Sequence, residues 1–143
     1  MTMVMTIGYQ GRTVDDVVSL LRSAEVKILA DVRLTPLSRK AGLSKNRLAA
    51  RLQEAGIDYV HLPHLGNPRA NRDAFRRGVP AAAATYREEL RTPEGQAALG
   101  ELFRLASQNR VALMCFEAYA AECHRSMVAD ALGEIGPVRT IHL

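Results

Sequence analysis

The residues whose types and spacing could perform chemistry are concentrated in one short segment, Cys115 to Arg125. This segment holds both cysteines of the chain, Cys115 and Cys123, together with Glu117, His124 and Arg125. A thiolate can act as a nucleophile, as half of a redox pair or as a metal ligand, whereas glutamate and histidine can move a proton. The segment is therefore the first candidate for a functional site.

The elements expected on either side would hold this segment at the edge of a sheet. Residues 111–115 form an apolar run typical of a strand buried on both faces, and 123–135 has the apolar spacing of a helix. Extending the helical stripe backwards places His124 on the inward face, with Cys123 and Arg125 on its flanks. The free N–H groups of a first helical turn would favour a thiolate or a bound anion there.

The rest of the chain alternates between strand and helix patterns. This alternation predicts a single α/β domain over 1–143, with a three-layer, doubly wound, Rossmann-like sheet of about five mainly parallel strands and helices on both faces. We expect strands over 3–9, 27–33, 57–63, 111–115 and 138–143, and helices over 13–24, 45–55, 81–91, 92–106 and 123–135.

In a sheet of this kind, ligands bind beyond the carboxyl ends of the strands. If the first and fourth strands are neighbours, the segments 8–12, 31–33 and 115–117 meet in one crevice. Their cationic side chains favour a small anion, such as a nucleotide or another phosphate, neutralised by arginine. The predicted ligand-binding residues are Gly8, Tyr9, Arg33, Ser38, Arg39 and Arg125.

The same crevice would hold groups able to react. Glu117 or His124 would move a proton, Asp31 would orient an arginine or a ligand hydroxyl, and Cys115 or Cys123 would supply a nucleophile. This set suggests a hydrolase or transferase acting on a nucleotide or other phosphate-containing substrate. The glycine-rich phosphate loops and the nucleophile elbow are missing from the sequence, so it names neither a substrate nor a cofactor.

Each candidate also has a purely structural interpretation. A cysteine at the end of a buried strand is ordinary packing, and Asp31 with Arg33 can be a structural ion pair. We assign no metal ligand, because C-x₇-C-H matches none of the usual zinc spacings. A reversible disulfide between the two cysteines stays open.

The connection over 64–80 lacks an apolar period and carries Arg69, Arg72, Arg76 and Arg77 against the acid Asp73. We predict a basic connecting loop that is solvated and mobile. The alternative function is a nucleic-acid-binding or redox- or metal-sensing module, which would use residues 69–77 and the two cysteines.

Composition sets the class of protein. With 48% hydrophobic and 24% charged residues, the chain is neither disordered nor fibrous, and 16 of its 19 cationic residues are arginine. The apolar runs are all shorter than the roughly 20 residues of a membrane span, so we expect a cytoplasmic protein without membrane partners. Two cysteines are too few for a disulfide scaffold, and the sequence does not determine the oligomeric state.

Four blocks of sequence carry a family resemblance: TIGYQGR (6–12), DVRLTPLSR (31–39), YVHLPHLGNPR (59–69) and LMCFEAYAAECHR (113–125). They resemble the bacterial and archaeal family catalogued as domain of unknown function 488. The resemblance implies a small α/β domain with an active or binding site, and no established reaction. This sequence departs from similar members at Gln10, where they often carry Glu or Ser, and at 118–120, which lack Asp-Pro.

Overall fold

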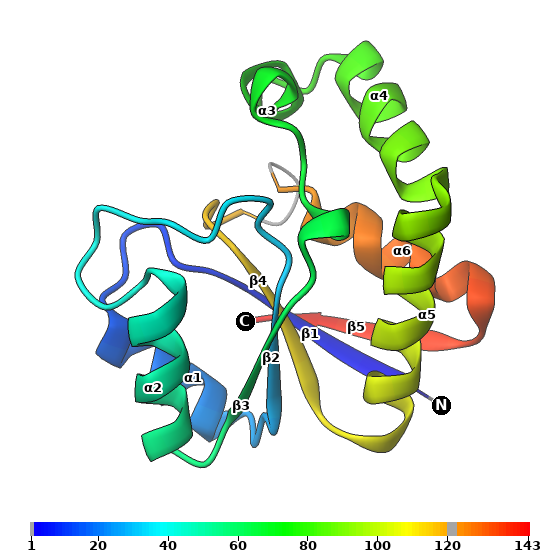
Figure 1. Ribbon diagram of the computed structural model, residues 1–143. Helices are drawn as coiled ribbons and strands as arrows, with labels where there is room; N and C mark the ends of the chain where they lie inside the picture. Colours follow the sequence, from blue (N-terminus) through cyan, green and yellow to red (C-terminus); the bar gives the residue numbers. More distant parts are fainter. Residues whose placement is uncertain (1, 120–122) are drawn as a thin grey trace.

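A parallel sheet forms the centre of the molecule (Figure 1). The computed structural model describes residues 2–119 and 123–143. In this part of the chain the five strands are all parallel and lie in the order β3-β2-β4-β1-β5. The strands are β1 (Thr2–Gly8), β2 (Ile28–Asp31), β3 (Asp58–His61), β4 (Val111–Cys115) and β5 (Val138–His142).

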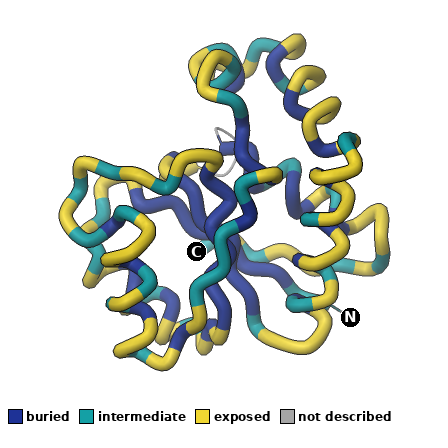
Figure 2. Tube along the Cα trace, viewed as in Figure 1, coloured by how far each residue is buried: buried dark blue, intermediate teal, exposed yellow. Residues whose placement is uncertain are grey.

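Helices cover both faces of this sheet, as predicted for a three-layer α/β domain. Side chains that alternate along the strands divide the core into two clusters, one packed under α1 and α2 and the other under α4, α5 and α6. Figure 2 shows the central strands β1, β2 and β4 as mostly buried segments between these two layers, whereas the edge strands β3 and β5 are more exposed. The helices are α1 (Val14–Ser23), α2 (Lys45–Glu54), α3 (Arg69–Arg76), α4 (Pro80–Arg91), α5 (Pro93–Gln108) and α6 (Arg125–Ile135).

Local sequence explains where the helices begin. The Thr13 side chain accepts a hydrogen bond from the Asp16 N–H, and the Asp16 carboxylate returns one to the Thr13 N–H, forming a capping box at the start of α1. At the start of α5 the Thr92 side chain accepts a hydrogen bond from the Gly95 N–H, ahead of Pro93 at the first helical position. Helix α6 begins at Arg125, which leaves His124 at its N-cap.

The register of the strands brings the predicted site residues to the carboxyl edge of the sheet. Gly8 of β1 is paired with Cys115 of β4, and Asp31 of β2 is paired with Met114, so the three strands end together. The first and fourth strands are neighbours, which is the condition under which we expect the three segments to meet. The chain leaves β1 towards α1 on one face and leaves β4 towards α6 on the other, so the switch point of the sheet lies between these two strands.

The predicted basic loop over 64–80 is wrong in part, because this connection contains a helix. A short 3₁₀ helix, η1 (Pro63–Leu65), is followed by α3, whose buried apolar side chain is Phe75. The ring of Phe75 meets the edge of Tyr86 on α4 at 5.9 Å between centroids. A helix of two turns with one buried apolar residue produces no periodic pattern, which is why the sequence resembles a loop.

Within the described ranges, no helix combines the length and the apolar character needed to cross a membrane.

Candidate functional site

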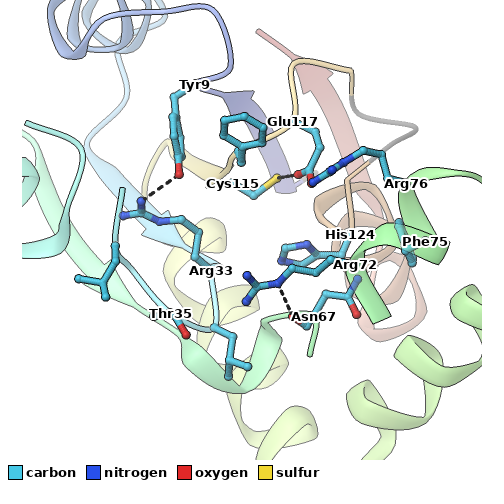
Figure 3. A pocket seen from close by; sticks show the side chains of 13 residues that line it. Tyr9, Arg33, Thr35, Asn67, Arg72, Phe75, Arg76, Cys115, Glu117 and His124 are labelled. Atoms are coloured by element: carbon cyan, nitrogen blue, oxygen red, sulfur yellow. Dashed lines mark hydrogen bonds and ion pairs between the residues drawn. The ribbon is translucent and has the colours of Figure 1, made fainter. Parts of the chain in front are cut away.

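A pocket of about 220 Å³ opens at the carboxyl edge of the sheet (Figure 3). Its wall is built by the segments that follow β1, β2 and β4, by α3, and by the residue that precedes α6. The side chains around it carry both charges and thiol sulfur. The lining residues are Tyr9, Arg33, Leu34, Thr35, Leu37, Asn67, Arg72, Phe75, Arg76, Cys115, Phe116, Glu117 and His124.

A buried ion pair between Asp31 and Arg33 supports one wall of the pocket. Nε of Arg33 lies 2.9 Å from Oδ1 of Asp31, and Nη2 lies 2.7 Å from Oδ2, so the guanidinium is held in a bidentate fork. The Tyr59 hydroxyl donates to the same carboxylate at 2.5 Å. Burial disfavours the charge on Arg33, but the hydrogen bonds and attraction of Asp31 outweigh that effect and raise the pKa of the guanidinium.

This pairing leaves few N–H groups of Arg33 available to donate to a ligand. Its Nη1 donates to the carbonyl of Leu43 at 2.8 Å and to the Tyr9 hydroxyl at 3.3 Å, and its guanidinium lies over the Tyr9 ring. Asp31 is fully buried behind it and is not in the pocket wall. Arg33 and Asp31 together therefore form a rigid, nearly neutral support for the pocket.

Gly8 brings the segment after β4 close to the end of β1. A Cβ atom at this position would overlap the backbone carbonyl of Glu117. Beyond the strands, Tyr9 N–H donates to the Cys115 carbonyl at 3.2 Å and Gln10 N–H to the Phe116 carbonyl at 2.8 Å. Glycine is therefore required here by close backbone approach.

The side chain of Gln10 has a structural partner. Its side-chain oxygen accepts a hydrogen bond from the Ala118 N–H at 3.0 Å. A neutral amide at this position therefore still holds the segment that follows β4.

Arg125 supports the same segment from behind. Its Nη1 donates to the Glu117 carbonyl at 2.6 Å and its Nη2 to the Ala118 carbonyl at 3.2 Å. Burial lowers the pKa of Arg125 to about 10, partly offset by Glu117, so the side chain stays charged at neutral pH. Arg125 is not among the lining residues, so the structure places this predicted ligand-binding residue behind the pocket.

Two arginines of α3 do reach the pocket. Nη2 of Arg76 forms an ion pair with Oε1 of Glu117 at 3.2 Å. Nε of Arg72 donates to the Asn67 carbonyl at 3.0 Å, and its two Nη atoms have no hydrogen-bond partner among the described residues. The sequence pattern predicts a solvated loop for both residues. Their i, i+4 spacing, which puts two side chains on one face of a helix, is the signal that would indicate their shared position.

The other arginines of the basic segment lie elsewhere. Arg69 is exposed at the start of α3, and Arg77 is exposed and paired with Asp73. The basic character of residues 69–77 is thus divided between the pocket and the solvent.

His124 points inward, as the helical spacing predicts, and is buried. Its Nε2 lies 2.7 Å from the Val32 carbonyl oxygen, and its ring meets the edge of Tyr86. Since a carbonyl can only accept, Nε2 carries the proton and Nδ1 has a free lone pair. Burial lowers the pKa of His124, opposed by the hydrogen bond to Val32 and by Glu117.

The two cysteines meet beside His124. Cys115 and Cys123 are joined as a disulfide, so neither presents a thiol in this structure. Cys123 Sγ lies 3.8 Å from His124 Nδ1, and Cys115 Sγ lies 3.6 Å from Oε2 of Glu117. The structure therefore brings four of the predicted catalytic residues into direct contact, and the fifth, Asp31, stands behind Arg33.

Ser38 and Arg39 are not brought to this pocket. They line a separate, more open hollow along residues 36–47. The Ser38 hydroxyl accepts from the Lys40 N–H at 3.1 Å, which fixes the turn of the segment. Arg39 is exposed to solvent.

Comparison with known proteins gives a family match. The family described as Domain of unknown function DUF488 matches residues 13–132, which is most of the chain. No curated protein and no solved structure matches it. The family match therefore does not identify a reaction, and the chemistry of the pocket is the basis for inferring one.

Proposed function

We propose that this chain, which belongs to the family of Domain of unknown function DUF488, binds a small phosphate-bearing anion in the pocket at the carboxyl edge of the sheet. The observation that carries the proposal is the guanidinium of Arg72. It faces the pocket with two nitrogens that no described residue uses, in a wall whose other arginines are already paired.

The balance of charge favours an anion at that position. Asp31 neutralises Arg33, and Glu117 neutralises Arg76, which leaves Arg72 without a carboxylate partner in the described wall. Arg125 adds a buried positive charge behind Glu117. A planar guanidinium with two free nitrogens suits two oxygens of one phosphate, and the concave wall strengthens the attraction relative to open solvent.

The mouth of the pocket suits a ligand with a flat apolar part. Phe116 is partly exposed and meets the edge of Tyr9 at 5.3 Å between ring centroids. Leu34 and Leu37 are also exposed at this rim. A phosphate near Arg72 with a base against these side chains describes a nucleotide, so we propose a nucleotide as the ligand class.

Glu117 is the group best placed to move a proton in such a complex. Its carboxylate is in the pocket wall, and its partner Arg76 is about half exposed and free to swing towards a ligand. His124 is less suited, because Nε2 is committed to Val32 and Nδ1 faces Cys123. Glu117 would take a proton from water or a hydroxyl while Arg72 and Arg76 neutralise phosphoryl oxygens, the pattern of a hydrolase or transferase.

The binding step can be tested with wild-type protein and two variants. Inorganic phosphate, pyrophosphate and nucleoside mono- and diphosphates are titrated by calorimetry against wild type, Arg72→Ala and the control Arg77→Ala. Wild type and the control should bind one of these anions alike, and Arg72→Ala should bind it at least about tenfold more weakly. Equal affinity in all three proteins, or no binding to wild type, would contradict the proposal.

A further inference from the structure

We propose that the reduced chain binds a thiophilic divalent cation, of which Zn²⁺ is the representative, through Cys115, Cys123 and His124. The two sulfurs and a ring nitrogen of His124 lie within 4.8 Å of one another, and all three residues are buried. Two thiolates and one imidazole are a donor set that zinc favours over magnesium or calcium. This site goes beyond the anion-binding proposal and does not depend on it.

The hydrogen bonds of His124 prepare it as a ligand. Nε2 donates its proton to the Val32 carbonyl, so the free lone pair is on Nδ1, the nitrogen that faces Cys123 Sγ at 3.8 Å. A metal-binding histidine characteristically donates its other N–H to a carbonyl or carboxylate, which fixes the tautomer and the ring orientation. That second partner is already in place here.

Both sulfurs also have N–H donors directed at them. Arg125 Nη1 lies 3.2 Å from Cys115 Sγ, and the Arg125 backbone N–H lies 3.5 Å from Cys123 Sγ. Such donors stabilise the negative charge of thiolates in a buried place. One residue, Arg125, thus supports both proposed thiolate ligands.

The fourth coordination position would face the pocket. Cys115, His124 and Glu117 all line it, and Oε2 of Glu117 lies 3.6 Å from Cys115 Sγ. The position would either take this carboxylate oxygen or remain open to the cavity. Zinc with three protein ligands and an accessible fourth position is the arrangement of catalytic rather than structural sites.

The disulfide and the metal site exclude each other, because they use the same sulfurs. A dithiol reductant supplies two electrons and two protons to the disulfide and is itself oxidised to a disulfide. Zinc then displaces the two thiol protons. The Cα atoms of Cys115 and Cys123 are 7.1 Å apart, so a change of side-chain rotamer in the reduced chain would move the two sulfurs apart to bind one ion.

The experiment counts zinc on the full chain in both redox states. Reduced and oxidised protein are each loaded with zinc, freed of excess by gel filtration, and analysed by atomic emission. The reduced wild type and the control His64→Ala, an exposed histidine of η1, should each retain about one zinc per chain. The oxidised wild type should retain none.

Three variants test the individual ligands. Cys115→Ser, Cys123→Ser and His124→Ala should each lower zinc affinity at least about tenfold. A reduced wild type without zinc, or variants that bind zinc as the wild type does, would overturn the proposal.

The wild-type chain also provides a readout that needs no variant. Bound zinc should slow the alkylation of both cysteines at least about tenfold in the reduced protein. Equal alkylation rates with and without zinc would overturn the site even if every variant misfolds. Phosphate binding by the metal-free protein is measured separately, so failure of one proposal is distinct from failure of the other.

Discussion

Nε2 of His124 lies 2.7 Å from the carbonyl oxygen of Val32, which ties the start of α6 to the residue that follows β2. This one hydrogen bond joins two walls of the pocket and decides which ring nitrogen is free. Because burial lowers the pKa of His124, the ring is neutral at neutral pH and its Nδ1 can accept a proton or bind a metal. The proposed anion site and the proposed zinc site both depend on the pocket geometry that this hydrogen bond fixes.

The stability of the chain should be sensitive to removal of a charge from the buried pair of Asp31 and Arg33, which supports the pocket. Asp31→Asn leaves the guanidinium buried without its counter-ion, and we expect it to lower the free energy of unfolding by about 3 kcal/mol. Asp15→Asn, which removes an exposed partner of Arg51, should change it by less than about 1 kcal/mol. Urea unfolding measures both, and similar small losses would show that the pair is not important for stability.

Tyr59→Phe should reveal a dependence on alkaline pH. Burial and the hydrogen bond to Asp31 raise the pKa of Tyr59 above its ordinary value of about 10. Between that value and the folded pKa, the unfolded chain loses the tyrosine proton and the folded chain keeps it, so stability falls as pH rises. The stability advantage of wild type over Tyr59→Phe should therefore be largest below pH ~10 and decrease above it. An advantage that is constant through this range would contradict the assignment.

Gly8→Ala should disturb the pocket because its methyl group would overlap the Glu117 carbonyl. We expect a loss of about 2 kcal/mol or more in unfolding free energy, together with weaker anion binding. Gly100→Ala is the matched control, since a methyl group there meets no neighbour within 4 Å and glycine is unfavourable within α5. The control should be neutral or stabilising. Equal effects of the two substitutions on stability would refute the argument from close approach.

Glu117→Gln should separate binding from chemistry. The amide removes the charge that pairs with Arg76 and competes with an anion, so phosphate affinity should increase several-fold. Any turnover that uses Glu117 to move a proton should be lost. Glu134→Gln, at an exposed position of α6, serves as the control. Weaker phosphate binding by Glu117→Gln would mean that the carboxylate itself holds the ligand.

Much of the fold could be predicted because the sequence carries local signals at every boundary. Caps at Thr13 and Thr92 and the apolar run 111–115 give elements whose ends agree with the structure within a few residues. Helix α3 was missed because its burial is limited to Phe75, too little for a hydrophobic period. The complete strand order depends on crossovers that local patterns do not encode.

The positions of site residues could be predicted where those residues adjoin a strand or a helix, but not where they lie in a long loop. Glu117 and His124 follow or precede elements of known direction, so their meeting could be expected. Ser38 and Arg39 lie in a long connection whose path the sequence does not determine, and it carries them away from the pocket. The nearness of Cys115 to Cys123 and His124 arises between a strand and a helix, so a spacing rule for zinc motifs does not detect it.

The central claim is that an anion binds between α3 and the ends of the strands. Diffraction from crystals of the wild-type chain grown with pyrophosphate tests it most directly. We expect phosphate density in the pocket, with oxygens within hydrogen-bond distance of the free Nη atoms of Arg72 and with Arg76 turned towards it. Density confined to the separate hollow along residues 36–47, with the Arg72 pocket empty, would contradict the account.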